Sequence, residues 1–375
     1  MGELSERDVA RLRTASLLLS VQPFQRPAEV AHWFGAMQAQ DLASGLWSFG
    51  VRLPHLDLAG VEAAVEAGEV LRTWPMRGTL HFIESSDARW LLALTGVRAL
   101  ARAAARRAYL GLDLATVTKA ADVVGDRLAG GGRMTRAALI EELGRAGIET
   151  AGQHAYHLLW YVSQIGVTCV GPNEGKEQSF VLLDEWAPEQ RAMEGDEALA
   201  ELALRYFRSH GPTTRQDFAG WAGITAAEAK AGIAGAGGAL VEAGYAGAQA
   251  WMAAELPDRA ADIVAGGDAE RVRLLPGFDE FMLGYKDRSI PLPREHAQRI
   301  VPGNNGVFQP TVVVDGRVFG TWRRAVKRTL KGARVEVRPE TFAALSARRA
   351  RSLESAAADY ARFMGLELAL VRPQV

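Results

Sequence analysis

The feature of this sequence that most restricts its fold is a local pattern that occurs three times along the chain. Each copy has helical segments, with apolar residues at three- and four-residue spacing, followed by two short strand-like runs. The strand-like runs of the three copies are Val70–Trp74 with Gly78–Ile83, Val167–Val170 with Phe180–Leu183, and Ala239–Val241 with Ala248–Met252. Helices followed by a hairpin are the order of elements in a winged helix, and a repeated order restricts the architecture more than any single motif. We therefore predict three tandem winged-helix units.

A different pattern begins near Arg271, where β-rich segments replace the order of helices and hairpin. Residues 312–321 are β-rich and turn at Asp315-Gly316, a favoured hairpin dipeptide, and a last helix is expected from about Pro339 to Met364. A chain of 375 residues is too long for one typical core. We predict an α+β protein with winged-helix units at residues 1–110, 111–190 and 191–265, and a C-terminal β-rich domain with a final helix at residues 266–375.

Several classes of site and location are disfavoured by residues that the sequence lacks. The single cysteine, Cys169, excludes an internal disulfide framework and a cysteine-based zinc site. His154 and His157 share a helix face, but no close carboxylate completes a metal site. No Walker loop, dinucleotide fingerprint or serine nucleophile elbow is present. No apolar run approaches the ~20 residues of a membrane span. We expect a cytoplasmic protein that uses no metal or other cofactor and does not contact a membrane.

Positive charge is concentrated in two segments, residues 97–107 and 317–334, although the formal net charge is −1. Residues 317–334 include no acidic residue and seven basic ones: Arg317, Arg323, Arg324, Lys327, Arg328, Lys331 and Arg334. Winged helices usually bind DNA. The phosphate contacts that we expect are Arg77, at the tip of the first hairpin, and Arg317, Arg323, Arg324, Lys327 and Arg328. The alternative is that these charges are solvated, and that the turns at Asp315–Arg317 and Asn304–Gly306 have no partner.

Two glutamines, Gln38 and Gln40, flank Ala39 directly after an apolar helical run. A glutamine side chain is costly to bury unless both its carbonyl and its amide find partners. Two of them at i and i+2 do not share a helix face. We expect them at a helix end or turn, where both can lean toward one point in a cleft. From the residues alone, they either carry chemistry or tie down nearby backbone groups.

Five motifs, in this order along most of the chain, resemble one known family. They are Gln38-Ala39-Gln40, Leu71–His81 (LRTWPMRGTLH), Gly211-Pro212 with Asp217-Phe218, Leu274–Asp279 (LLPGFD) with Gly284-Tyr285, and Gly320-Thr321-Trp322. The sequence is similar to the winged-helix superfamily that contains the alkylpurine DNA glycosylases AlkZ and YcaQ. The resemblance implies three tandem winged helices, a C-terminal β domain, and a monomeric enzyme that acts on double-stranded DNA. It also implies that the enzyme excises N7-alkylated purines, including bulky adducts and interstrand crosslinks made by antibiotics, in repair or in self-resistance.

The same resemblance implies roles for the glutamines. Gln38 and Gln40 match the Gln-x-Gln catalytic motif of the AlkZ type, whereas Asp41 lies one place too late for the Gln-x-Asp motif of the YcaQ type. Glutamine has no proton to exchange near pH 7. An N7-alkylated purine is already cationic, however, and leaves as a neutral base, so the enzyme needs to place a water and stabilise a cationic sugar. We hypothesise that Gln38 and Gln40 hold that water beneath C1′. Asp41 is either an electrostatic helper or a cap for the following helix.

Two other functions remain open from the sequence. The same modules would also suit a noncatalytic winged-helix DNA-binding regulator, or a scaffold with a degenerate site. An enzyme would release free base from DNA that contains 7-methylguanine, whereas a regulator would bind that DNA without cleaving a bond.

Overall fold

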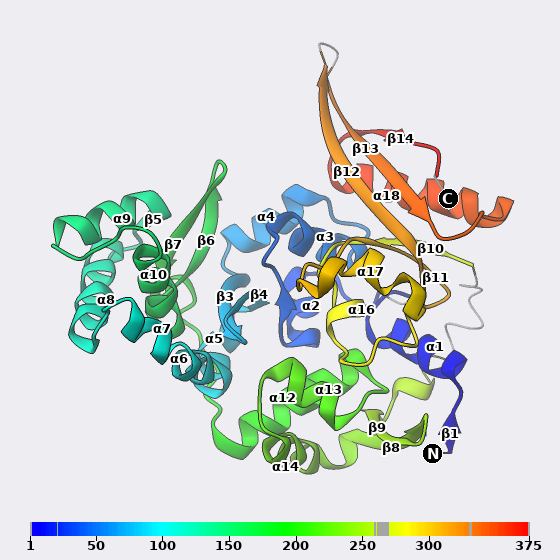
Figure 1. Ribbon diagram of the computed structural model, residues 1–375, viewed down its shortest axis with the longest axis horizontal. Coiled ribbons are helices and arrows are strands. Elements are labelled where there is room, and N and C mark those ends of the chain that lie inside the picture. Colours follow the sequence, from blue (N-terminus) through cyan, green and yellow to red (C-terminus); the bar gives the residue numbers. More distant parts are fainter. Residues whose placement is uncertain (1, 21, 259, 261–269, 330–331, 374–375) are drawn as a thin grey trace.

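All three predicted hairpins are present, and helices precede each one (Figure 1). The structure, a computed structural model, describes residues 2–20, 22–258, 260, 270–329 and 332–373. The hairpins are β3 (Val70–Met76) with β4 (Thr79–Glu84), β6 (Thr168–Glu174) with β7 (Glu177–Leu182), and β8 (Leu240–Tyr245) with β9 (Ala248–Ala253). The predicted α+β class is confirmed.

The helices fall into three groups, one before each hairpin. The first group is α1 (Glu6–Ser16), α2 (Pro27–Phe34), α3 (Leu42–Arg52) and α4 (Leu58–Glu66). The second is α5 (Ala88–Leu91), the π-helical η2 (Leu92–Gly96), α6 (Val97–Arg102), α7 (Ala104–Tyr109), α8 (Leu114–Leu128), α9 (Arg136–Arg145) and α10 (His154–Gln164). The third is α11 (Leu183–Trp186), α12 (Gly195–His210), α13 (Arg215–Ala222) and α14 (Ala226–Ala236).

Short polar side chains start many of these helices by accepting the backbone hydrogen bonds that a first turn leaves open. Thr135 accepts from the Ala138 N–H at the start of α9. Thr225 and Glu228 form a reciprocal capping box at the start of α14. Local sequence therefore decides where these helices begin.

The first two hairpins do not stand alone, because they join in one six-stranded sheet. Its order is β2-β4-β3-β6-β7-β5, where β2 is Met37–Gln38 and β5 is Arg133–Thr135. The two hairpins meet where Arg72 of β3 pairs with Val170 of β6. The third hairpin pairs in parallel with β1 (Glu3–Leu4) in a separate three-stranded sheet.

The C-terminal part is a five-stranded sheet with one long helix against it. Its strands are β10 (Val272–Leu275), β11 (Thr311–Val314), β12 (Arg317–Thr329), β13 (Gly332–Thr341) and β14 (Glu367–Leu370), in this order. Short helices α16 (Glu280–Leu283) and α17 (Ala297–Ile300) lie between β10 and β11 in the chain. The β12–β13 hairpin extends well beyond the body of the molecule (Figure 1). The basic segment is therefore a β-hairpin.

The predicted start of the last helix was wrong. Helix α18 runs from Ala347 to Phe363, and Pro339 lies in β13 opposite Trp322 of β12. The reason is the burial period, because Val335, Val337 and Pro339 are buried at every second position, as in a strand. Ser346 caps α18 by accepting from the Arg349 N–H.

The hydrophobic clusters cross the predicted unit boundaries. One cluster joins residues of the first unit to the C-terminal sheet, as where Trp47 of α3 packs against Tyr360 and Phe363 of α18. A second joins the first unit to α12 and α13, for example through Trp90 and Phe207. The predicted boundary at residues 265 and 266 lies outside the described residues. Within the described ranges, no helix is long and apolar enough to cross a membrane.

Candidate active site

Gln38 lies on β2, the edge strand of the six-stranded sheet, and Gln40 lies in the bend between β2 and α3. Gln38 pairs with His81 of β4, and the Ala39 N–H donates to the Leu80 carbonyl at 2.8 Å. Ala39, between the two glutamines, is fully buried, whereas Gln38 and Gln40 both have access to solvent. The expectation of a helix end or turn is met by Gln40, which lies in the bend directly before the α3 cap, and was wrong for Gln38, which lies in a strand.

The two carboxamides differ in their surroundings. Gln40 is exposed, and its Oε1 accepts from the Leu80 N–H at 3.2 Å, so this side chain does tie down a backbone group. Gln38 is half-buried, and among the described residues no hydrogen bond is found to its carboxamide. The Gln38 carboxamide can therefore hydrogen-bond to a bound molecule.

Asp41 begins helix α3. Its carboxylate accepts from the Ser44 N–H at 3.1 Å and lies 3.4 Å from the guanidinium of Arg324 on β12. The interpretation of Asp41 as a helix cap is confirmed, whereas its role as an electrostatic helper remains a prediction. The contact with Arg324 brings the base of the basic hairpin next to the glutamine pair.

A buried carboxylate from the C-terminal part lies behind β2. Glu280, which is 2 % exposed, accepts the Gln38 backbone N–H at Oε1 at 3.2 Å. Its Oε2 accepts from Trp221 Nε1 at 2.9 Å and lies 3.2 Å from Nε2 of His210. Glu280 therefore connects β2 with α12 and α13. Its role was not predicted, since Glu280 is far from Gln38 in the sequence.

The charges around Glu280 keep it ionised. Burial by itself would raise the pKa of Glu280, but the hydrogen bond from His210 and the charges of His210 and Arg77 lower it to about 2. Burial and, after it, the charge of Arg77 lower the pKa of His81 to about 4. Nδ1 of His81 lies 2.8 Å from the Thr79 carbonyl, so the neutral ring carries its proton there. Near neutral pH, the cluster holds an anionic Glu280 and a neutral His81.

Arg77 does not lie on a free hairpin tip. The β3–β4 turn packs against α13, and the Arg77 guanidinium donates to the Trp221 carbonyl and lies 3.5 Å from Nε2 of His81. Burial lowers the pKa of Arg77, and Glu280 opposes that effect. The expectation of an exposed phosphate contact at this tip was wrong, because the turn is a packing surface between the first and third units. Sequence reasoning also missed Arg72, whose Nε donates to the Ala39 carbonyl at 3.1 Å.

Arg317 lies at the opposite end of β12 from the hairpin tip. Its guanidinium is 2.9 Å from the Glu6 carboxylate, and the preceding Gly316 packs against Ala10 and Thr14 of α1. The turn at Asp315-Gly316 is therefore not free to enter a DNA groove, and Arg317 is not placed with the other predicted contacts. The turn at Asn304–Gly306 is exposed.

The remaining predicted contacts lie along β12 and alternate between its two faces. Arg323 and Lys327 share one face, on which they pair across to Arg338 and Arg334 of β13. Arg324 and Arg328 lie on the other face. Sequence reasoning did not single out the two arginines of β13 as contacts, although Arg334 belongs to the basic segment. Lys331 lies outside the described residues.

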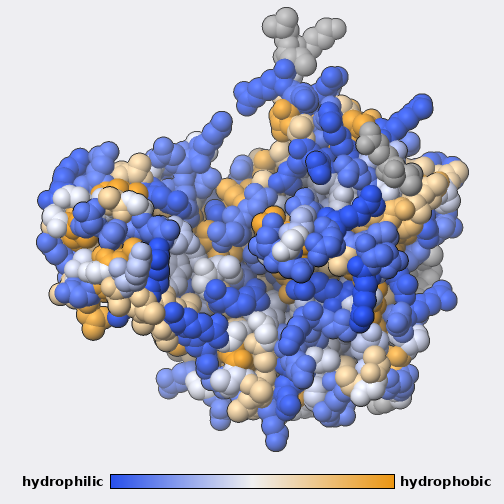
Figure 2. All heavy atoms as spheres, in the orientation of Figure 1, coloured by the Kyte–Doolittle hydropathy of each residue, from blue (hydrophilic) through white to orange (hydrophobic). Residues whose placement is uncertain are grey.

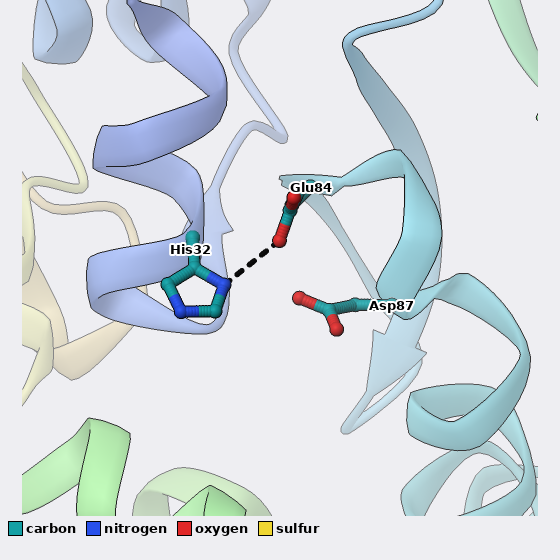
Figure 3. Close-up of side chains that lie close together, drawn as sticks. All are labelled: His32, Glu84 and Asp87. Atoms are coloured by element: carbon teal, nitrogen blue, oxygen red, sulfur yellow. Dashed lines mark hydrogen bonds and ion pairs between the residues drawn. The ribbon is translucent and has the colours of Figure 1, made fainter. Parts of the chain in front are cut away.

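One cluster has the composition of a metal site. His32, Glu84 and Asp87 have potential ligand atoms within 4.8 Å of one another (Figure 3). The guanidinium of Arg191 contacts all three, at 3.1 Å from His32 Nδ1 and 2.9 Å from Glu84 Oε2. Arg191 thus supplies the positive charge that these groups require, and we assign the cluster a structural role that ties the chain after β7 to the first unit.

The surface of the molecule is hollowed between two projecting hairpins (Figure 2). One side of the hollow is the part with β6 and β7, and the other side is the part with β12 and β13 (Figure 1). The surface along the β12–β13 hairpin is mainly hydrophilic (Figure 2).

The sequence and the fold are both similar to known DNA glycosylases. The family model described as "DNA glycosylase AlkZ-like" matches residues 31–363. An interstrand DNA cross-link repair glycosylase from Streptomyces sahachiroi is 27% identical over 306 residues, which are 76% of this chain and 79% of that protein. The solved structure of the Streptomyces sahachiroi DNA glycosylase AlkZ aligns with a TM-score of 0.77 and 25% identity, over 98% of this chain and 100% of that chain. The chain therefore belongs to the AlkZ-like family of DNA glycosylases.

Proposed function

We propose that this protein hydrolyses the N-glycosidic bond of N7-alkylated purines in double-stranded DNA, with Gln38 and Gln40 as its catalytic residues. The observation that carries the proposal is the pair itself. The Gln38 carboxamide projects from an edge strand and that of Gln40 from the bend that follows it, both have access to solvent, and that of Gln38 has no partner among the described residues.

The surroundings of the pair suit a leaving group that is already charged. Two titratable groups that adjoin Gln38 are poor proton donors and acceptors near neutral pH, because His81 has a pKa of about 4 and Glu280 a pKa of about 2. An N7-alkylated purine needs no proton to leave. What it needs is an oriented water and a negative potential near C1′, which carboxamide oxygens supply. Neutral lesions such as uracil should therefore be poor substrates.

The DNA-binding part of the proposal rests on the β12–β13 hairpin. Arg323, Lys327, Arg328 and Arg334 are exposed on it, and its base adjoins the active site through the contact of Arg324 with Asp41. The tip of the other projecting hairpin, β6–β7, carries Glu174 and Glu177 around Lys176 and would repel a phosphate backbone. We infer that the duplex lies against the basic hairpin in the hollow. We also keep, as part of this proposal, the interpretation of the three groups of helices and hairpins as tandem winged helices.

The choice of lesion follows from the relative and from the chemistry. The Streptomyces sahachiroi relative is named for the repair of interstrand cross-links. We infer that bulky N7 adducts and crosslinks are also substrates here, in repair or in self-resistance to an alkylating antibiotic, and that the enzyme works as a monomer without a metal.

Release of 7-methylguanine from a synthetic duplex tests the proposal. The wild-type protein should release free base and leave an abasic site, whereas Q38A/Q40A should bind the duplex without releasing base. Q249A is the matched control, because Gln249 is exposed on β9, away from the pair, and this variant should keep wild-type activity. Activity in the double variant would refute the assigned roles, and a wild-type protein that binds DNA but releases no base would favour the noncatalytic regulator.

A further inference from the structure

We propose that Glu280 is a positioning residue for the glutamine pair, and that it sets the place of β2 relative to the DNA. The inference rests on the proposed catalytic role of Gln38 and Gln40. Glu280 itself does not reach the surface, because it is 2 % exposed, so it would act through the backbone of Gln38.

The hydrogen-bond pattern of β2 explains why an outside anchor is needed. The Ala39 N–H donates to the Leu80 carbonyl, so the neighbouring pair of Gln38 and His81 is the kind that exchanges no backbone hydrogen bonds. The Gln38 N–H then points away from the sheet. Because β2 is an edge strand, no further strand accepts this hydrogen. Oε1 of Glu280 accepts it at 3.2 Å.

Strand β2 is short, so its backbone pairing with β4 is limited. It makes two residue pairs with β4, Met37 with Phe82 and Gln38 with His81. Three side-chain bonds supplement this pairing, from Glu280 to the Gln38 N–H, from Gln40 to the Leu80 N–H, and from Arg72 to the Ala39 carbonyl. Of these three bonds, only the one from Glu280 connects β2 to an element outside its own sheet.

The carboxylate of Glu280 is itself held in a fixed orientation. Oε2 interacts with both Trp221 Nε1 and His210 Nε2, which leaves Oε1 directed at Gln38. His210 is fixed in turn, since its ring stacks on Tyr206 with centroids 4.7 Å apart and its carbonyl accepts from the Tyr285 hydroxyl at 2.9 Å. Elements α12, α13 and α16 thus jointly define where the catalytic strand lies.

Glu280→Gln is the variant that tests this role. Its carboxamide keeps the shape of the side chain but has one accepting oxygen, and its NH₂ group would face N–H donors. Because a misplacement of about 1 Å can lower a rate about 100-fold, we expect the maximal single-turnover rate of base release to fall about 100-fold. Affinity for an undamaged duplex should change less than about twofold, since the hairpin is unaltered. The backbone N–H of Gln38 should exchange its hydrogen with solvent faster than in the wild-type protein.

Asp279→Asn is the matched control. Asp279 is the adjacent buried carboxylate, and it pairs with Arg52 at 2.9 Å; among the described residues, no hydrogen bond joins it to β2. Its Oδ1 also caps α16 by accepting from the Phe281 N–H at 2.9 Å, and asparagine is an equally good cap, so this substitution preserves the start of the helix that carries Glu280. This variant should lose stability, yet its folded form should keep the wild-type maximal rate and the slow exchange of the Gln38 amide. If E280Q does not fold, W221F removes one donor to Glu280, and a lowered rate with unchanged duplex affinity is expected there.

Three results would overturn the inference. The first is a wild-type maximal rate in E280Q, or in W221F if E280Q does not fold. The second is a loss of rate in D279N equal to that in E280Q. The third is an unchanged rate of hydrogen exchange at the Gln38 backbone N–H in E280Q. If the wild-type protein itself released no base, the proposed function would fail. The exchange measurement would then still decide whether Glu280 holds β2, because it does not depend on catalysis.

Discussion

The sharpest test of the proposed DNA contact is the salt dependence of binding after removal of one charged face of the hairpin. Arg323, Lys327 and Arg334 are exposed and share a face of β12–β13. If each neutralises one phosphate, each releases condensed counterions and contributes about 0.9 to the slope of log K against log[salt]. The variant R323Q/K327Q/R334Q should therefore have a slope that is smaller by about 2.7.

This change in slope corresponds to a large difference in affinity. When salt is raised from about 50 to about 200 mM, the wild-type protein should lose about 40-fold more affinity than the triple variant does. Fluorescence anisotropy of a labelled undamaged duplex at several KCl concentrations measures both slopes. The substitutions should not unfold the hairpin, because Lys327 lies directly opposite Arg334, and like charges in that position are destabilising.

Arg317→Gln is the control for this experiment. It also removes one positive charge from β12, but at the far end of the strand, where Arg317 pairs with Glu6. Its slope should equal that of the wild-type protein. An unchanged slope in the triple variant would show that the hairpin does not contact phosphates, and a change in R317Q about one-third as large as that in the triple variant would show that net charge alone matters.

Two further predictions concern the active site. The pKa of His81, about 4 in the fold against about 6.5 when unfolded, means that the unfolded chain binds more protons between these values. The free energy of unfolding should therefore fall by about 3 kcal/mol as the pH drops from 6.5 to 4, and H81N should flatten this part of the curve in urea titrations. Asp41→Ala should lower stability by about 1 kcal/mol through loss of the α3 cap, and Asp41→Ser should restore it. A persistent deficit in D41S would instead indicate that the Arg324 contact matters more.

Much of the local structure could be read from the sequence. The three hairpins, the α+β class and the Gln-x-Gln motif depend on residue spacing within short segments. Local patterns of this kind are encoded by neighbouring residues, through periodicity, turn residues and caps. The same information failed at Pro339, which was predicted to begin the last helix but lies in β13.

The exposure of individual charges could not be read from the sequence. Arg77 lies at a hairpin turn, a position that is usually on the surface, but here the turn packs against Trp221. Arg317 likewise belongs to the basic segment but lies at the wrong end of β12 to act with the rest. In both cases the outcome depends on which element packs against the turn, and no local pattern specifies that.

By itself, the sequence determined most of the segments that become helices and the three hairpins of the first two-thirds of the chain, because short-range sterics and periodicity decide local structure. Tertiary structure alone decided that Gln38 lies on an edge strand, that Glu280 accepts the Gln38 backbone N–H across 242 positions of sequence, and that the first two hairpins share a sheet. The physical reason is that an edge strand leaves backbone donors unpaired. The distant group that accepts these hydrogens is determined only by the packing of the whole chain.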